Sequence, residues 1–170
     1  MLFRSRSVYA RTKLAAEAEL QALAARRGFG LCIARVFGLV APVQPASYVL
    51  PSLIRRVRER NVQEIPGLSY VRDYLDSRDV CAGLLALRYA TGVVNLCSGR
   101  GVCLRDLLIE IVRKLRPQEE EEVISEVTEA PGRPDDLPWI VGDPSLFLRL
   151  TAKEPVTIPL AETVRAACES

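Results

Sequence analysis

The chain has 170 residues, enough for one folded unit with its own hydrophobic core. Hydrophobic residues make up 49% and charged residues 26%, an ordinary balance for a globular protein that excludes intrinsic disorder. The 23 basic and 21 acidic residues give a net charge of +2 and are spread along the sequence. We therefore expect neither nucleic acid nor a membrane surface as a partner.

The cysteine and histidine content argues against a metal site and against a disulfide framework. There is no histidine, and the odd number of cysteines shows no Cys-x-x-Cys spacing. The cysteines are Cys32, Cys81, Cys97, Cys103 and Cys168. The first seven residues, "MLFRSRS", lack the apolar run of a signal peptide, and no segment approaches the roughly 20 apolar residues of a membrane span. We expect a protein of the reducing cytoplasm.

A helix from Tyr9 to about Arg27 is predicted first, because strong helix formers continue there without Gly or Pro. Gly28 is placed to end this helix in a left-handed conformation. Residues 29–40 form a nearly continuous apolar run, which predicts a strand buried on both faces of a parallel sheet.

A loop with two prolines, residues 41–47, separates this strand from a predicted helix over Tyr48–Arg60. The apolar face of that helix consists of Leu50, Leu53, Ile54 and Val57. An extended segment follows, and Asp76 or Ser77 can cap a helix that runs to about Ala90.

A short buried strand and a glycine turn are predicted over residues 92–102, followed by a helix over Leu104–Arg116. The acidic run Glu119–Glu122 precedes residues 123–128, whose alternation predicts a strand. After a proline-rich loop, two short helices are expected, near Asp143–Leu150 and from about Pro159. Helices thus alternate with apolar strands, the pattern of an α/β protein with parallel strands.

Tyr9 and Lys13 are the first candidate for chemistry. Their spacing of four residues places both side chains on one face of a helix. An ammonium group beside a phenol favours the phenolate, so the pair can exchange a proton with a hydroxyl or carbonyl group. The spacing alone also fits a solvated Tyr and Lys.

Five segments in order resemble the extended short-chain dehydrogenase/reductase family of nucleotide-sugar epimerases, dehydratases and reductases. "YARTKLAAEAEL" is similar to the family's catalytic Tyr-Lys helix, and "ARVFGLVAP" to its Arg-x-Phe-Asn-x-x-Gly-Pro strand and loop. "YVRDYLDSRDVCAGLLAL", "GVVNLCSGRGVCLRDLL" and "GRPDDLPWIVGDPS" resemble its later strand, turn and Arg-Pro-x-Asp-x-Pro segments. Within the family, the resemblance is strongest to reductases of GDP-4-keto-6-deoxymannose.

The resemblance implies a cofactor, NAD or NADP, and no metal. It makes Tyr9 the proton donor to a keto oxygen of the sugar, and Lys13 the residue that holds the nicotinamide ribose and lowers the pKa of the phenol. Val36 would also contact the cofactor. The implied reaction of the complete enzyme is reduction or epimerisation of a nucleoside-diphosphate sugar.

On the substrate side, the resemblance assigns Arg72 and Arg133 to the diphosphate, because a guanidinium group matches phosphate oxygens bidentately. Gly38, where the family prefers Asn, and Gln44 are also assigned to substrate binding. For Arg72 the alternative is an ion pair with Asp73 or Asp76. Two further polar residues are interpreted as structural: Glu17, paired with Lys13 on its helix, and Asp79.

The implied fold is the C-terminal part of a Rossmann-type parallel sheet plus the small substrate-binding region. Residues 1–45, with the Tyr-Lys helix, would end the Rossmann-like part. Residues 46–170 of the same unit would form mainly the substrate-binding region, with Rossmann elements interleaved. No Gly-x-x-Gly-x-x-Gly occurs in the sequence. We expect a half enzyme, inactive alone and completed by an amino-terminal half. The alternative is a non-enzymatic module that binds nucleotide sugars or dimerises through the Tyr-Lys helix.

Overall fold

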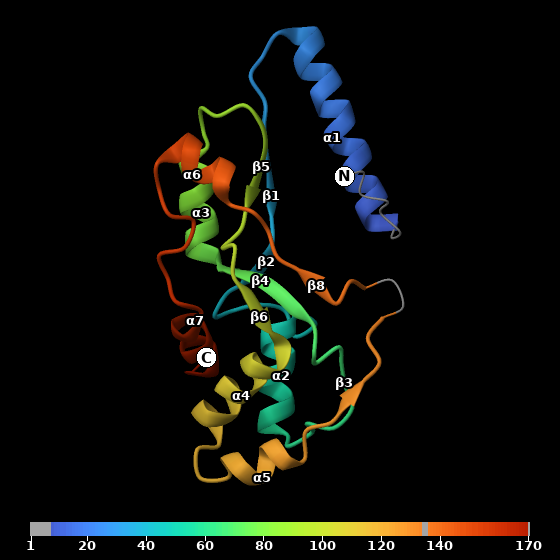
Figure 1. Ribbon diagram of the computed structural model, residues 1–170, viewed down its shortest axis with the longest axis vertical. Helices are drawn as coiled ribbons and strands as arrows, with labels where there is room; N and C mark the ends of the chain where they lie inside the picture. Colours follow the sequence, from blue (N-terminus) through green and yellow to red (C-terminus); the bar gives the residue numbers. More distant parts are fainter. Residues whose placement is uncertain (1–7, 134–135, 170) are drawn as a thin grey trace.

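The computed structural model describes residues 8–133 and 136–169, which form an elongated molecule with two stacked parts (Figure 1). The segment 1–7, where no signal-peptide run was found, lies outside the described residues. One part contains a two-stranded sheet with helices on both sides, and the other is built around a four-stranded sheet and a bundle of helices.

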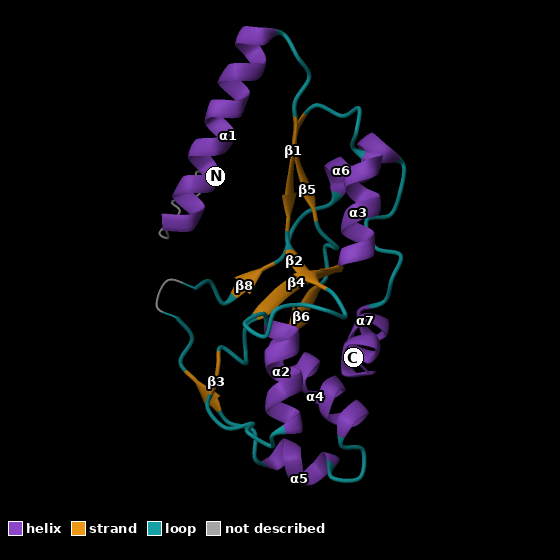
Figure 2. Cartoon of the chain, turned by 180° about the vertical axis from the view of Figure 1, so that it is seen from behind, coloured by secondary structure: helices purple, strands orange, loops and turns teal. Residues whose placement is uncertain are grey.

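The first part is organised by two parallel strands, β1 (Cys32–Val36) and β5 (Gly92–Leu96), which pair in register over five residues. Helices α3 (Ser77–Ala86) and α6 (Ser145–Thr151) cover one face of this sheet. The long helix α1 (Val8–Arg27) lies on the other side (Figure 2). The small core between the sheet, α3 and α6 includes Val94, Leu96 and Phe147.

Strand β4 (Val71–Asp76) is the centre of the second part. It pairs in parallel with β2 (Gly38–Val40) and β8 (Trp139–Ile140), and antiparallel with β6 (Gly101–Cys103). A small separate pair joins β3 (Ile65–Pro66) to β7 (Glu129–Ala130). Three strands that lie far apart in the sequence therefore meet on one six-residue strand.

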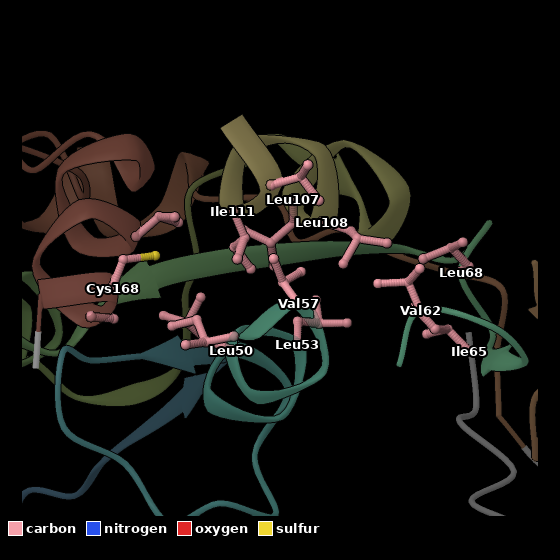
Figure 3. Close-up of a cluster of buried hydrophobic side chains, with 14 of the residues drawn as sticks. Leu50, Leu53, Val57, Val62, Ile65, Leu68, Leu107, Leu108, Ile111 and Cys168 are labelled. Atoms are coloured by element: carbon pink, nitrogen blue, oxygen red, sulfur yellow. The ribbon is translucent and has the colours of Figure 1, made fainter. Parts of the chain in front are cut away.

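The main hydrophobic core lies beside β4 and is formed largely by helices (Figure 3). These helices are α2 (Val49–Arg58), α4 (Leu104–Leu115), α5 (Glu120–Ser125) and α7 (Leu160–Glu169). Val57, Leu108 and Ile111 have no exposed surface there. This core supports the sheet that carries Arg72.

Several local expectations are confirmed. Helix α1 ends where predicted, and Gly28 has the left-handed φ of 70° that terminates it. The four apolar residues predicted for the inner face of α2 are all buried. Asp76 caps α3 by accepting a hydrogen bond from the backbone N–H of Arg78. Burial would raise the pKa of Asp76, but hydrogen bonds from Arg78 and Thr163 lower it to about 2.

The prediction of one fully buried strand over residues 29–40 is wrong in two respects. The run divides into β1 and β2, which belong to different sheets. Moreover, four of the five residues of β1 are only partly buried, and Val36 is 40% exposed. Helices α3 and α6 pack on one face of β1, whereas α1 buries little of the other face.

The prediction of a strand over residues 123–128 is also wrong, because residues 120–125 form helix α5. Val123 fills the core, and the acidic residues around it gather on one guanidinium group. Arg60 donates to Glu119 at 3.1 Å and to Glu126 at 2.8 Å, and it also pairs with Glu122. Acidic residues favour a helix amino terminus, so the charge run stabilises a helix here.

Two smaller differences concern the length of α3 and the direction of a strand. Helix α3 ends at Ala86, four residues earlier than predicted, and a turn follows. The pair β4–β6 is antiparallel within an otherwise parallel arrangement.

Among the described residues, no helix combines the length and the apolar character that a membrane crossing requires.

Leu108→Ala should lower the free energy of unfolding by about 2–5 kcal/mol, because it leaves a cavity in the main core. Urea denaturation followed by circular dichroism measures this loss. The control is Leu85→Ala, at a leucine that is 68% exposed on α3 and should change stability by less than about 0.5 kcal/mol. Equal losses in the two variants would contradict the assignment of the core.

Candidate functional site

An ion pair fixes α1 to the sheet. The carboxylate of Glu17 accepts two hydrogen bonds from Arg35 in β1, from Nε at 3.0 Å and from Nη2 at 2.5 Å. Arg35 thereby lowers the pKa of Glu17, although the carboxylate is partly buried. The predicted pairing of Glu17 with Lys13 is corrected, because the fork of an arginine from the neighbouring strand offers two aligned donors.

The face of α1 that approaches β1 follows from its burial. Ala10, Glu17 and Ala24 recur every seven residues, and they are the better covered positions of the helix together with Leu23. Lys13 precedes Glu17 by one turn, and Tyr9 precedes Lys13 by one turn, so both lie on the flank of this face. Because α1 runs antiparallel to β1, its first turns lie toward the carboxyl end of that strand (Figure 2).

Tyr9 and Lys13 are together, as their spacing predicts, but they are not enclosed. The ammonium group of Lys13 lies 5.6 Å from the centre of the Tyr9 ring. Tyr9 is 71% exposed, and Lys13 is exposed as well. The pair lies toward the carboxyl end of β1, the end at which ligands bind in open α/β sheets, and no part of the described chain encloses it.

Val36 and Gly38 lie where the chain passes from one sheet to the other. Val36 is the last residue of β1 and is paired in register with Leu96. At Gly38 a Cβ atom would come within 2.7 Å of the Asp73 carbonyl oxygen and 2.8 Å of the Tyr74 ring. Glycine is therefore required there by the close approach of β4, which is a structural reason for the residue besides the predicted substrate contact.

Arg72 has a fixed position on β4. Its guanidinium group donates to Asp136 at 2.9 Å and to the Val71 carbonyl oxygen at 2.9 Å, and it lies 5.2 Å from the centre of the Tyr70 ring. The alternative partners, Asp73 and Asp76, are occupied by other donors. A guanidinium group has five N–H donors, so this pairing leaves donors for a ligand. The side chain is 18% exposed.

Arg133 belongs to the same region of the surface as Arg72. Its carbonyl oxygen accepts a hydrogen bond from the backbone N–H of Asp136 at 3.0 Å, and the side chain of Asp136 pairs with Arg72. Asp136 thus contacts Arg133 through its backbone and Arg72 through its side chain. Arg133 itself is exposed.

Tyr74 is a buried aromatic residue beside the ion pair of Arg72 and Asp136. Burial raises the pKa of Tyr74 to about 12, although the charge of Arg72 opposes that shift. Tyr74 therefore remains a neutral phenol in the physiological range and is unsuited to the acid–base role assigned to Tyr9.

Gln44 lies in a different setting. Its side-chain amide accepts from the backbone N–H of Ala41 at 3.1 Å and donates to the carbonyl oxygen of Leu39 at 3.2 Å, so it closes its own loop. The same loop lines an open hollow of about 400 Å³ together with Pro51, Arg55 and other residues of α2. The contacts of Gln44 are therefore structural, and no contact in the described chain connects it with Arg72.

Two residues of this region were missed. Asp136 stands in the quoted Arg-Pro-x-Asp-x-Pro segment, so its signal was present in the sequence, but its partner Arg72 lies 64 positions away. Tyr70 is the first residue of the quoted segment "YVRDYLDSRDVCAGLLAL", but nothing in the sequence indicated its role, which follows from packing. A Cβ atom at Gly132 would lie 2.3 Å from the Tyr70 hydroxyl oxygen, so Tyr70 sits tightly against the start of the Arg133 loop.

Residues 1–97, which are more than half of the chain, match the family model of the NAD dependent epimerase/dehydratase family. The chain belongs to this family.

Two curated relatives act on GDP-linked deoxy sugars according to their names. The chain is 32% identical over 112 residues to the GDP-6-deoxy-D-mannose reductase of Pseudomonas aeruginosa, covering 61% of this chain and 37% of that protein. It is 24% identical over 132 residues to the GDP-6-deoxy-D-talose 4-dehydrogenase of Aggregatibacter actinomycetemcomitans, covering 74% and 42%.

The fold is that of Rossmann-type extended short-chain enzymes. The chain superimposes on RMD from Pseudomonas aeruginosa, solved with NADPH, with a TM-score of 0.80 and 24% identity, covering 96% of this chain and 56% of that one. For the UDP-glucose 4-epimerase of Thermus thermophilus, solved with NAD, the TM-score is 0.77 at 24% identity, covering 98% and 54%. The chain spans about half the length of these structures and less than half of the curated relatives.

Glu17→Gln should loosen α1 without unfolding the rest of the chain, because the ion pair with Arg35 is the main polar contact of that helix. Amide hydrogen exchange of α1 should become faster while exchange in α2 and α4 stays unchanged. Lys114→Gln is the control, since it removes a surface ion pair with Glu169 elsewhere.

The pH dependence of this contact has a definite sign. Because the pKa of Glu17 is lowered in the folded protein, the ion pair stabilises α1 at pH values above the ordinary value of about 4.3. That stabilisation is lost as the pH falls below this value. The measurement is the amide exchange rate of α1 divided by that of α2. A ratio that is the same at about pH 6 and at about pH 3.5 would contradict the role of Glu17.

Proposed function

We propose that this chain is the catalytic-helix and substrate-binding half of an NAD(P)-dependent enzyme that reduces or epimerises a nucleoside-diphosphate 4-keto-6-deoxy sugar. The observation that carries the proposal is the link between Arg72 and Arg133 through Asp136. The contact brings the backbone of Arg133 close to the partner of Arg72, and two guanidinium groups on one surface would suit a diphosphate, which offers several oxygens for bidentate hydrogen bonds. The likeness to a GDP-6-deoxy-D-mannose reductase supports GDP as the nucleotide.

Asp136 has a definite role in this proposal. An anionic diphosphate would repel a neighbouring carboxylate, so Asp136 serves the nucleotide by orienting Arg72 rather than by binding phosphate. Its carboxylate takes one Nη2 donor of Arg72 and leaves Nε and other donors free to turn outward. The same carboxylate can accept from a sugar hydroxyl group, which favours a sugar beside the diphosphate over a simple anion.

The residues of this chain fit only one end of a dinucleotide. Tyr9, Lys13 and Val36 lie toward the carboxyl end of β1, which is where a nicotinamide is held in sheets of this kind. The Gly-rich turn that cradles a dinucleotide diphosphate is not in the sequence. When bound, the nicotinamide supplies a hydride to the sugar or removes one from it.

The work of this chain's own residues is proton transfer and orientation. Tyr9 donates a proton from its hydroxyl group to the keto oxygen of the sugar. Lys13, whose ammonium group lies 5.6 Å from the ring centre, stabilises the phenolate that remains. Arg72 and Arg133 hold the sugar nucleotide by its diphosphate, so that the keto carbon stays within reach of Tyr9.

A second unit that carries the dinucleotide turn would join beside β1. In the described chain, β1 pairs with β5 along one edge and offers its other edge to a further strand. Four of its five residues are only partly buried, and α1 also carries the exposed side chains of Tyr9, Leu14 and Leu20. An apolar parallel strand that is paired along one edge only is the expected boundary of a larger sheet.

One observation favours the alternative, a module without catalytic activity. Of the 20 residues of α1, only Ala24 is buried, and most of the helix's alanines are exposed. A helix with small side chains on its surface permits close packing against the same helix of a second copy. In this alternative, the arginines bind a nucleotide sugar and α1 serves dimerisation.

GDP should bind this chain alone, and Arg72→Lys should weaken the binding by about tenfold or more, because lysine cannot make a bidentate contact with phosphate. Isothermal titration calorimetry measures the dissociation constants. The matched control is Arg113→Lys, at an arginine that pairs with Glu110 and Glu120 on the outside of α4 and should leave the affinity unchanged. Absence of binding at millimolar GDP, or equal losses in both variants, would refute the nucleotide site.

Tyr9→Phe should lower the turnover number by about 100-fold or more in the chain complemented with the amino-terminal half of the Pseudomonas aeruginosa reductase. The loss reflects the missing proton donor, so affinity for GDP should not change. Tyr89→Phe provides the control, because Tyr89 is 84% exposed in the turn after α3. An active Tyr9→Phe protein would show that Tyr9 is not the acid. If the unchanged chain binds GDP but shows no turnover after complementation, the alternative of a module without catalytic activity is favoured.

A further inference from the structure

The buried carboxylate of Asp73 is the strongest polar anchor beside the proposed site. Asp73 is 1% exposed and lies on β4 between Arg72 and Tyr74. One oxygen accepts from the backbone N–H of Ser98 at 2.7 Å and from its hydroxyl group at 2.6 Å. The other accepts from the N–H of Gly99 at 2.9 Å and of Gly142 at 3.2 Å.

These donors come from two segments that are separate in the sequence. Ser98 and Gly99 form the turn between β5 and β6, whereas Gly142 follows β8 by two residues. In the described residues, no lysine or arginine pairs with Asp73, so neutral donors alone compensate its burial. A buried carboxylate satisfied in this way holds its donors firmly, since each released N–H or O–H group would be left unpaired.

Gly142 is held on its other side as well. A Cβ atom at Gly142 would lie 2.5 Å from the sulfur of Cys97, so the backbone passes tightly against the end of β5. Because Gly142 comes shortly after β8, its hydrogen bond to Asp73 fixes the end of the strand that pairs Ile140 with Arg72. The loop with Arg133 and Asp136 leads into this strand.

That loop is thereby fixed at both ends relative to β4. Its start packs against Tyr70, where a Cβ atom at Gly132 would lie 2.3 Å from the hydroxyl oxygen. Its end is fixed through β8 and Gly142 to Asp73. Two arginines can share one diphosphate only if the segments that carry them keep a constant separation.

We propose that Asp73 is a positioning residue of the nucleotide site: its carboxylate, by holding Gly142, sets the distance between Arg72 on β4 and the Arg133 loop. It acts through the backbone and does not touch the ligand. The inference rests on the proposed function for the identity of the ligand, and on the hydrogen bonds of Asp73 for the mechanical coupling.

The experiment compares Asp73→Asn with Asp79→Asn. Asp79 is a close match: it is 3% exposed, and it accepts from the N–H and hydroxyl groups of Thr157 at 3.1 and 2.5 Å and from the N–H of Ile158 at 3.0 Å. It fixes the segment before α7 rather than the Arg133 loop. In both variants an amide nitrogen replaces one accepting oxygen, so the loss of stability should be similar.

GDP affinity is the first readout, measured where both variants are fully folded. Asp73→Asn should weaken binding by about tenfold, and Asp79→Asn should leave it within about twofold of the unchanged chain. Equal effects would overturn the inference, because they would show general destabilisation only. If Asp73→Asn does not fold, Ser98→Ala takes its place, because it removes one of the four hydrogen bonds to Asp73. Ser98→Ala should also weaken GDP binding, and Asp79→Asn remains the control.

The second readout does not depend on GDP. Trp139 in β8 is the single tryptophan of the chain and is 65% exposed, so 5-fluorotryptophan gives one ¹⁹F resonance at the end of the Arg133 loop. Asp73→Asn should shift or broaden that resonance, and Asp79→Asn should not. If the unchanged chain fails to bind GDP, the proposed function falls, while the ¹⁹F comparison still decides whether Asp73 positions the loop. An unmoved resonance in Asp73→Asn would overturn the inference.

Discussion

The site depends on the single strand β4. Its six residues pair with three other strands, and consecutive side chains on it serve different parts of the molecule. Arg72 pairs with Asp136, Asp73 holds the turn after β5 and the end of β8, and Asp76 caps α3 and accepts from Thr163 of α7 at 2.6 Å. The hydrogen bonds to the two aspartates therefore fix the arginine to both parts of the molecule at once.

A second constraint acts on the other component of the site. Helix α1 buries little apolar surface, so the bidentate contact between Glu17 and Arg35 largely decides where its first turns lie. The consequences for function are asymmetric. The surface around Arg72, where we propose that the nucleotide binds, rests on the main hydrophobic core. Tyr9 and Lys13 lie exposed on a helix that a second unit would have to cover before water could be excluded from them.

The sequence predicted the parts of the fold that depend on local chemistry. The helix-ending role of Gly28, the inner face of α2 and the cap at Asp76 follow from spacing and residue type within a few positions. The family resemblance supplied the order of the elements and the candidate residues. The pairing of Arg72 with Asp136, of Glu17 with Arg35, and of Arg60 with the glutamates around α5 could not be predicted, because these partners are 18 to 66 positions apart. Residues 120–125 form a helix although the alternation after Glu122 resembled a strand, because Val123 packs into the core and the acidic residues suit a helix amino terminus.

Membership in the epimerase/dehydratase family establishes the class of this chain, and the proposed function requires that Arg72 and Arg133 hold a diphosphate together. A crystal structure of the chain with GDP tests this most directly. We expect phosphate oxygens within hydrogen-bond distance of both guanidinium groups, with Asp136 still paired to Arg72. GDP bound instead in the hollow beside Pro51 and Arg55, or touching neither Arg72 nor Arg133, would contradict it.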